Sequence, residues 1–204
     1  MMHEKSYKDI EIKQLNSSER ESALSLICEA FKEHPMLPPG TSHKTTQALF
    51  RFMFDEFGSK KSTCIHGIKD SGNNLACTAL TLSSTDEPSL LDALRCTLSF
   101  VRILGWSLAL AFLRINASKP KRTEPHLELL LLGTSPSFQK GGLGRAMMSH
   151  LYKFGKDKGY AGITLEVAKN SPAYGFYCRE GFVIDKTVYI KDMPLSLMHC
   201  KLDS

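Results

Sequence analysis

The stretch SFQKGGLGRAMMSHLYKFG, residues 137–155, decides the fold. Three glycines fall within positions 141–144, and apolar residues then recur at helical spacing at Met147, Leu151 and Phe154. Glycine at the start of a helix costs backbone entropy, so its use there indicates that a ligand approaches the backbone more closely than a Cβ would permit. The free N–H groups and the macrodipole of a helix start attract anions, above all phosphate. A tight turn without a ligand is the alternative.

Two familiar phosphate-binding motifs do not fit this stretch. A Walker loop ends in Gly-Lys-Ser/Thr, whereas Gly144 is followed by Arg145 and Ala146. A dinucleotide fingerprint requires a third glycine three residues after Gly144, where the chain has Met147. The glycine loop therefore belongs to another class of anion site.

The rest of the chain alternates strand-like and helix-like segments without strict βα order. Ser17 or Ser18 is expected to cap the first helix, with Glu21 completing a capping box. HLELLLLGT, residues 126–134, is continuously apolar and reads as a fully buried central strand. Together these segments predict an α/β or α+β fold with a mixed sheet. The other expected strands are residues 9–15, 63–68, 75–82, 162–169, 183–190 and 195–202, and the expected helices lie at about 18–31, 42–57, 143–157 and 171–180.

Residues 88–122 form a predominantly apolar insertion. Its large apolar side chains step by four and three alternately, which predicts one or two helices with a broad apolar face. Arg95, Arg102 and Arg114 interrupt the segment, so no uncharged run reaches the roughly 20 residues of a membrane span. We expect a buried or capping helix, and a helix lying at a membrane interface is the alternative.

Composition predicts one domain over residues 1–204. The net charge of +5 indicates a solvated basic face or a phosphate-rich small ligand. The densest basic patch, SKPKR at 118–122, has no interleaved aromatic residues, so we expect no nucleic-acid partner. The six cysteines are scattered without a CxxC pair, which predicts reduced thiols and no metal site. No apolar leader is seen at the N-terminus, and a cytoplasmic protein is expected.

Two motifs of the sequence resemble those of a known family. QKGGLG, residues 139–144, matches the Q/R-x-x-G-x-G/A signature of the GNAT superfamily of acetyl-CoA dependent N-acetyltransferases, and NSPAYGFYCREGF, residues 170–182, resembles its second motif. The resemblance implies a mostly antiparallel sheet of about seven strands flanked by helices. A helical insertion between strands 3 and 4 is similar to the layout of the puromycin-acetyltransferase-like branch, although HLEL lacks the aromatic residue of that branch.

The resemblance also implies a binding site for acetyl-CoA. Backbone N–H groups of the glycine loop would hold the pyrophosphate, and the main chain at Leu132 and Thr134 would pair with the pantetheine arm where the central strand leaves its neighbour. The implied cofactor-binding residues are Leu132, Thr134, Gln139, Lys140, Gly141, Gly142, Leu143, Gly144, Arg145 and Asn170.

Two residues are candidates for proton transfer. Tyr177 stands at the family's general-acid position, with a core tyrosine as the alternative. Glu128 is a carboxylate inside a leucine-rich strand, where burial would favour its neutral form and make it a better base. It also lies eleven residues before Gln139, as the catalytic glutamate of some family members does. An outward-facing side chain, a structural ion pair or a water chain are the alternatives, and His126 is a weaker candidate.

The activity implied by the resemblance is transfer of an acetyl group from acetyl-CoA to a primary amine, by direct attack in a ternary complex. A small-molecule acceptor is preferred, without a metal and without stable membrane insertion. A protein or peptide acceptor and a non-catalytic CoA-binding sensor are the alternatives, and a homodimer is left open.

Overall fold

The computed structural model describes residues 11–32, 40–57, 62–85 and 90–202. Within them a seven-stranded sheet runs in the order β1-β2-β3-β4-β5-β7-β6, and every neighbouring pair is antiparallel except β4 and β5. This confirms the predicted mixed, mostly antiparallel sheet; residues 9 and 10 of the expected first strand lie outside the described residues. The strands are β1 (Ile12–Gln14), β2 (Thr63–Lys69), β3 (Leu75–Ser83), β4 (His126–Thr134), β5 (Gly162–Ala168), β6 (Val183–Ile190) and β7 (Met193–Lys201).

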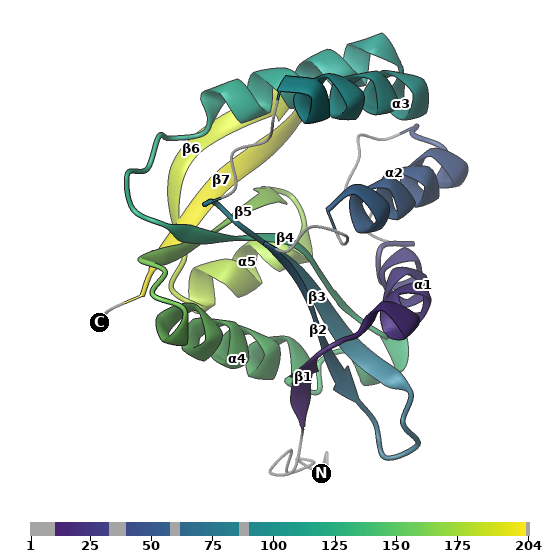
Figure 1. The fold of residues 1–204 in the computed structure, drawn as a ribbon, viewed down its shortest axis with the longest axis vertical. Helices are drawn as coiled ribbons and strands as arrows, with labels where there is room; N and C mark the ends of the chain where they lie inside the picture. Colours follow the sequence, from purple (N-terminus) through teal and green to yellow (C-terminus); the bar gives the residue numbers. More distant parts are fainter. Residues whose placement is uncertain (1–10, 33–39, 58–61, 86–89, 203–204) are drawn as a thin grey trace.

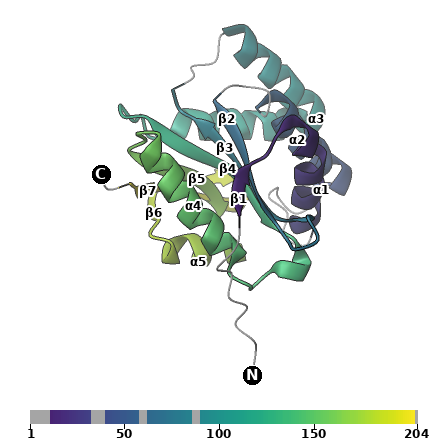
Figure 2. The same ribbon diagram turned by 60° about the horizontal axis from the view of Figure 1, so that its bottom comes forward.

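Helices cover both faces of the sheet (Figures 1 and 2). One apolar core joins the sheet to α1, α2 and α3, and a second core joins it to α4 and α5. Each large apolar side chain buried in this way contributes roughly 1.5–3 kcal/mol of stability. The helices are α1 (Arg20–Ala30), α2 (His43–Glu56), α3 (Leu90–Ser118), α4 (Leu143–Asp157) and α5 (Pro172–Arg179), with short 3-10 turns η1 (Ser17–Glu19) and η2 (Pro136–Phe138).

The expected cap of the first helical segment is wrong by one or two residues, and the cap lies on the 3-10 turn η1 that leads into α1. The side chain of Asn16, rather than Ser17 or Ser18, accepts a hydrogen bond from the backbone N–H of Ser18 at 2.9 Å. Glu19 returns the bond to the backbone N–H of Asn16 at 3.1 Å, so the box is Asn16–Glu19. Both serines lie inside the turn because asparagine is at least as good a cap as serine.

β4 carries the irregularity that shapes the site. Leu131 pairs with Leu80 and Leu129 pairs with Thr81, which leaves Leu130 as an extra residue in a bulge. β4 and β5 are paired only from His126 to Leu129, after which β4 continues along β3 and β5 continues along β7. The two central strands therefore part beyond Leu129. β4 is central as predicted, but its residues alternate between buried and half-buried, so it is not fully buried on both faces.

The insertion between β3 and β4 is helical, as predicted, and its helix α3 is sharply bent. Gly105 has φ 75° and ψ 165°, a conformation outside the helical region. The rings of Phe100 and Phe112 stack with centroids 5.6 Å apart, whereas twelve residues of straight helix would separate them by about 18 Å. α3 is therefore a hairpin of two arms, lying along the top of Figure 1. The segment Arg95–Ser118 is long and apolar enough to cross a membrane by length and composition, but the bend divides it.

Candidate active site

The glycine loop connects the end of β4 to the start of α4. Lys140 and Gly142 have φ values of 61° and 87°, and Gly142 is the N-cap of α4. The first hydrogen bond of the helix runs from Ala146 N–H to the carbonyl of Gly142 at 3.0 Å. Among the described residues, none accepts from the backbone N–H groups of 142–145. A row of free donors at the positive end of a 15-residue helix has the geometry that anions favour, and the predicted anion site stays a prediction.

Gly142 is required by its backbone conformation. A Cβ built at this position meets no atom within 4 Å, so the space above the loop is open, but the positive φ favours glycine. At Gly144 a Cβ would lie 3.5 Å from the ring of Phe176, an ordinary contact. Gln139 holds the loop against β4 by donating from Nε2 to the carbonyl of Thr134 at 3.4 Å.

The two long cations of the loop differ in their surroundings. Lys140 is exposed. Arg145 donates from Nε to Glu180, at the end of α5, at 3.2 Å. The Glu180 side chain is largely buried, whereas that of Arg145 is mostly exposed. This ion pair connects the start of α4 to the end of α5 at the surface. Arg145 can reach an anion only by sharing its charge with Glu180.

A histidine pair anchors α4 to the sheet. His66 of β2 lies with Nδ1 3.1 Å from Nε2 of His150 on α4 and with Nε2 3.1 Å from the hydroxyl of Thr81 on β3. Burial, followed by the charge of His150, lowers the pKa of His66 to about 3. The anchor is therefore a neutral imidazole at physiological pH, and it fixes the helix that presents the loop.

Tyr177 lies beneath the parting strands on the α4–α5 face. Its ring packs edge-to-face with Phe176 and Phe182, with centroids 5.2 and 5.6 Å away. Burial, followed by the neighbouring Cys77 and Tyr152, raises its pKa. Its hydroxyl has no hydrogen-bond partner in the part of the chain that the structure describes, which leaves a neutral phenol as a proton donor.

Glu128 faces the opposite side of the sheet and is held in an ion-pair triad. Lys119, the residue after α3, contacts Glu128 and lies 2.8 Å from Glu166 of β5. Burial disfavours the ammonium of Lys119, but the two carboxylates outweigh it and raise its pKa. The structure thus supplies the ion pair that the sequence left open as an alternative for Glu128. Its assignment as base stays a prediction.

The triad lines a small cavity of about 40 Å³ under the end of the insertion. Arg122 pairs with Asp185 in its wall, and Nδ1 of His199 lies 2.8 Å from the same carboxylate. His126 also lines the cavity, with its ring Nδ1 3.4 Å from the carbonyl of Glu124. The lining carries Glu128, Glu166 and Asp185 against Lys119 and Arg122, a formal charge of −1.

The remaining predicted cofactor-binding residues lie on β4 and in the turn before α5. Leu132 packs into the α4–α5 core, and the hydroxyl of Thr134 donates to the thiol of Cys77 at 3.4 Å. The β4 backbone from Leu130 to Thr134 has no pairing with β5, as the resemblance implied. Asn170 is exposed in the turn before α5.

Sequence reasoning missed Lys119 and Glu166. Glu166 stands in the strand GITLEVAK, where a lone carboxylate among apolar residues is the same signal that singled out Glu128. Lys119 carried no such signal, because its position depends on where α3 ends.

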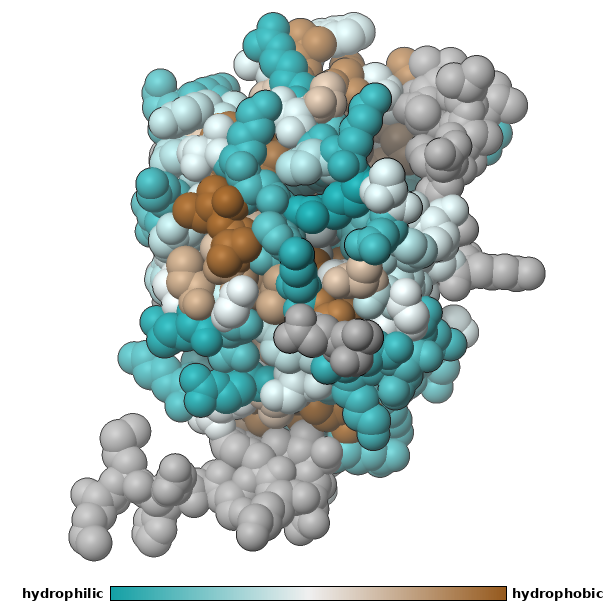
Figure 3. All heavy atoms as spheres, turned by 90° about the vertical axis from the view of Figure 1, so that its left-hand side faces the viewer, coloured by the Kyte–Doolittle hydropathy of each residue, from teal (hydrophilic) through white to brown (hydrophobic). Residues whose placement is uncertain are grey.

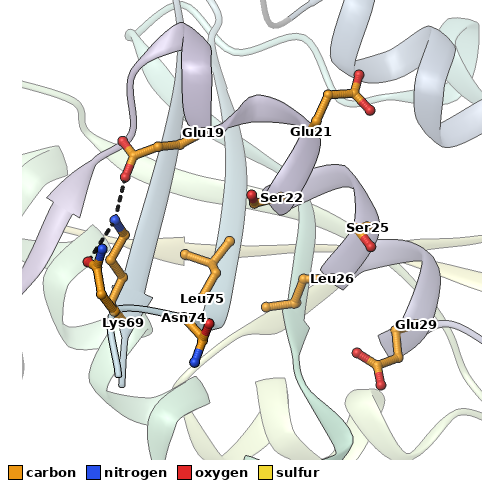
Figure 4. A pocket seen from close by; sticks show the side chains of 10 residues that line it. Glu19, Glu21, Ser22, Ser25, Leu26, Glu29, Lys69, Asn74 and Leu75 are labelled. Carbon is orange, nitrogen blue, oxygen red and sulfur yellow. Dashed lines mark hydrogen bonds and ion pairs between the residues drawn. The ribbon is translucent and has the colours of Figure 1, made fainter. Parts of the chain in front are cut away.

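A larger hollow lies elsewhere, between α1 and the β2–β3 hairpin (Figure 4). It measures about 530 Å³ and is open and polar. Glu19 and Lys69 form an ion pair of 2.7 Å at its rim, and Glu29 points toward it from α1. No predicted site residue lines this hollow, so it is separate from the parting strands.

A seven-stranded sheet whose two parallel central strands part, followed by a glycine loop at the start of a helix, is the GNAT acetyltransferase fold. The chain belongs to the acetyltransferase (GNAT) family, whose model matches residues 38–182. No curated protein sequence matches the chain significantly.

Solved structures with the same fold span nearly the whole chain. An arylalkylamine N-acetyltransferase 2 from Aedes aegypti has a TM-score of 0.71 at 12% identity, covering 96% of this chain and 100% of that one. A histone acetyltransferase HPA2 and related acetyltransferase from Corynebacterium glutamicum has 0.65 at 22%, covering 93% and 94%. The PaiA N-acetyltransferase from Thermoplasma acidophilum, in complex with coenzyme A, has 0.61 at 17%, covering 94% and 98%. At these identities the likeness shows the fold alone.

Proposed function

We propose that this protein is an acetyl-CoA dependent N-acetyltransferase acting on a primary amine by direct attack in a ternary complex. One observation carries the proposal. The point where β4 and β5 part has a neutral tyrosine on one face, two carboxylates on the other, and an open loop of backbone donors at the end of β4.

The residues present fit coenzyme A. The free N–H groups at 142–145 suit its pyrophosphate, and no Cβ stands in the open space above Gly142. The unpaired edge of β4 beyond Leu129 offers main-chain groups to an extended pantetheine arm. Acetyl-CoA supplies the acetyl group as an activated thioester.

The chain's own residues would handle the protons. Glu128 accepts the proton that an ammonium must lose before its nitrogen can attack the thioester carbon. Tyr177 donates a proton to the sulfur as the carbon–sulfur bond breaks, because its neutral phenol carries a hydrogen that none of the described residues accepts. The second proton of the attacking nitrogen restores the phenol of Tyr177, and Glu128 releases its proton to solvent, so the products are an acetylated amine, free coenzyme A thiol and one proton.

We propose a small cationic amine as the acceptor. The cavity beside Glu128 is small, and its lining has a formal charge of −1 with Lys119 in place. The solved structures of similar fold include both an arylalkylamine N-acetyltransferase and a ribosomal-protein-S18-alanine N-acetyltransferase from Escherichia coli, so the fold does not select between acceptor classes. The favouring observation is the cavity itself.

The test follows thiol release with acetyl-CoA and a panel of monoamines, diamines, peptides with free N-termini and lysine peptides. Acetyl-CoA binding is measured separately, as a rise in melting temperature. Amine-dependent thiol release that is fastest with small amines supports the proposal. Binding without thiol release for any acceptor would instead establish a CoA-binding sensor, and preference for the peptides would establish a protein acceptor.

A further inference from the structure

The α3 hairpin leaves large apolar side chains in solvent. Leu98, Leu110 and Leu113 are 54%, 45% and 43% exposed, and Trp106, next to the bend at Gly105, is 70% exposed. We call these four residues the apolar face. The side of the molecule seen in Figure 3 is mostly hydrophilic, with one compact hydrophobic patch and smaller hydrophobic spots, some of them at the upper edge, the level at which α3 lies in Figure 1. An exposed apolar group of this kind marks an interaction surface.

Three arginines accompany the apolar face. Arg95, Arg102 and Arg114 are exposed, and in the described part of the chain none of them has an ion-pair or hydrogen-bond partner. Residues 95–118 contain no Asp or Glu at all. The surface is therefore both apolar and cationic, which is the composition of helices that lie in the headgroup region of anionic membranes.

Charge argues against a second copy of the chain as the occupant. A two-fold dimer places the same patch on both subunits, so the three arginines of each copy would approach those of the other without an acidic partner from this segment. An anionic lipid surface supplies the missing negative charge, and each arginine near such a surface strengthens binding.

The bend sets the depth of the contact. The arms on either side of Gly105 cover residues 90–104 and 106–118, and both fall short of the roughly 20 residues of a span. A hairpin of this length lies in the interface rather than crossing it. Tryptophan favours that region because its ring is apolar while its N–H needs a polar partner.

We propose that the α3 hairpin docks the protein reversibly on anionic phospholipid surfaces, with Trp106 at the acyl boundary and the arginines among the headgroups. Lys119 follows α3 directly, so the cavity at Glu128 lies next in sequence to the docked segment. Docking is independent of acetyl transfer, because the two surfaces share none of the residues named.

The chain offers its own probe, because Trp106 is its single tryptophan. The full chain is mixed with vesicles of phosphatidylcholine alone, or of equal parts phosphatidylcholine and phosphatidylglycerol. With the anionic vesicles the emission of Trp106 should shift to shorter wavelength and be quenched by lipids brominated on the acyl chain. High salt should reverse both effects, since it screens the arginines. Unchanged emission with anionic vesicles would overturn the proposal.

Variants distinguish vesicle binding through the α3 hairpin from binding through other surfaces. Leu110→Asp together with Leu113→Asp should abolish the shift, whereas Val183→Asp, at a β6 residue that is 54% exposed, should keep it. Each of Arg95→Gln, Arg102→Gln and Arg114→Gln should weaken vesicle binding roughly five-fold. Melting temperatures confirm that every variant is folded. An emission shift that depends on protein concentration without vesicles would overturn the proposal in favour of self-association.

Discussion

The two ends of β4 are built on opposite principles. At its end, the loop presents the backbone N–H groups of residues 142–145, which no described residue satisfies. At its start, Glu128 is already satisfied by Lys119, which also holds Glu166. The loop can leave its donors open because water satisfies them at the surface. The carboxylates are only about one quarter exposed, so they need a partner.

The two ends therefore differ in how much rearrangement the binding of a ligand would require. The loop end, which we propose binds acetyl-CoA, is preformed and open, so binding there should need little rearrangement. The acceptor end is closed on itself, so an incoming ammonium must share or replace the contacts of Lys119. We therefore expect cofactor binding to tolerate changes at Glu128 and acceptor binding to depend on them.

The largest effect is expected at the cofactor end from Gly142→Val. A β-branched residue resists the φ of 87°, and its side chain would enter the open space above the loop. The rise in melting temperature with acetyl-CoA, which corresponds to about 2.7 kcal/mol when the ligand is at 100 times its Kd, should be lost.

Gly159→Val is the matched control for this variant. Gly159 follows the other end of α4, has a φ of 75° and likewise meets no atom within 4 Å. It should carry the same backbone strain, roughly 1–2 kcal/mol, and keep the full response to acetyl-CoA. An equal loss of response in both variants would show that strain, and not the loop, is responsible.

The next effect is expected at the point where the strands part. Tyr177→Phe keeps the ring between Phe176 and Phe182 and removes the proton donor. Acetyl-CoA binding should be unchanged while kcat falls by about 10²–10⁴-fold. Steady-state kinetics with a working amine check this, and an unaltered kcat would remove Tyr177 from the mechanism.

Glu128→Gln tests the acceptor end, with Glu166→Gln as its counterpart. Lys119 contacts both residues, so each variant leaves one ion pair, and each should lose a similar stability of about 1 kcal/mol or less. If Glu128 is the base, its replacement lowers kcat and removes the acidic limb of the pH–rate profile. Glu166→Gln should act mainly on the KM of the amine.

Melting temperature and pH profile are both measured on both variants. Full activity in Glu128→Gln, with a lowered melting temperature, would establish a structural ion pair instead of a base. Loss of the acidic limb in both variants would mean that the pair acts as one titrating unit.

The same two ends of β4 also differ in how much of their structure could be predicted from the sequence. The loop was predictable because its glycines, its helix and its anion preference are all local to residues 137–155. Glu128 was singled out by its apolar neighbours, but its partners come from β5 and from the end of α3, and no local pattern joins them. The bend at Gly105 was also hidden, because the apolar spacing of α3 continues through it.

The dependence of stability on pH distinguishes the histidine anchor of α4 from the ion pairs of Lys119. The anchor of α4 is neutral, and the pKa of His66 falls from about 6.5 in an unfolded chain to about 3 in the fold. Its contribution to stability is present above pH 6.5 and is lost as the pH falls toward 3, at about 1.4 kcal/mol per pH unit.

The raised pKa of Lys119 acts the other way: its contribution is present below its unfolded pKa, about 10.4, and is lost only as the pH rises beyond that. Acid should therefore destabilise the fold through His66, while the contribution of Lys119 is retained. Between pH 7 and pH 5, denaturant unfolding should show a smaller loss of stability for His66→Gln than for the wild type, whereas His43→Gln, which removes an exposed histidine, should follow the wild type. Parallel losses in all three proteins would show that His66 is not the acid-sensitive group.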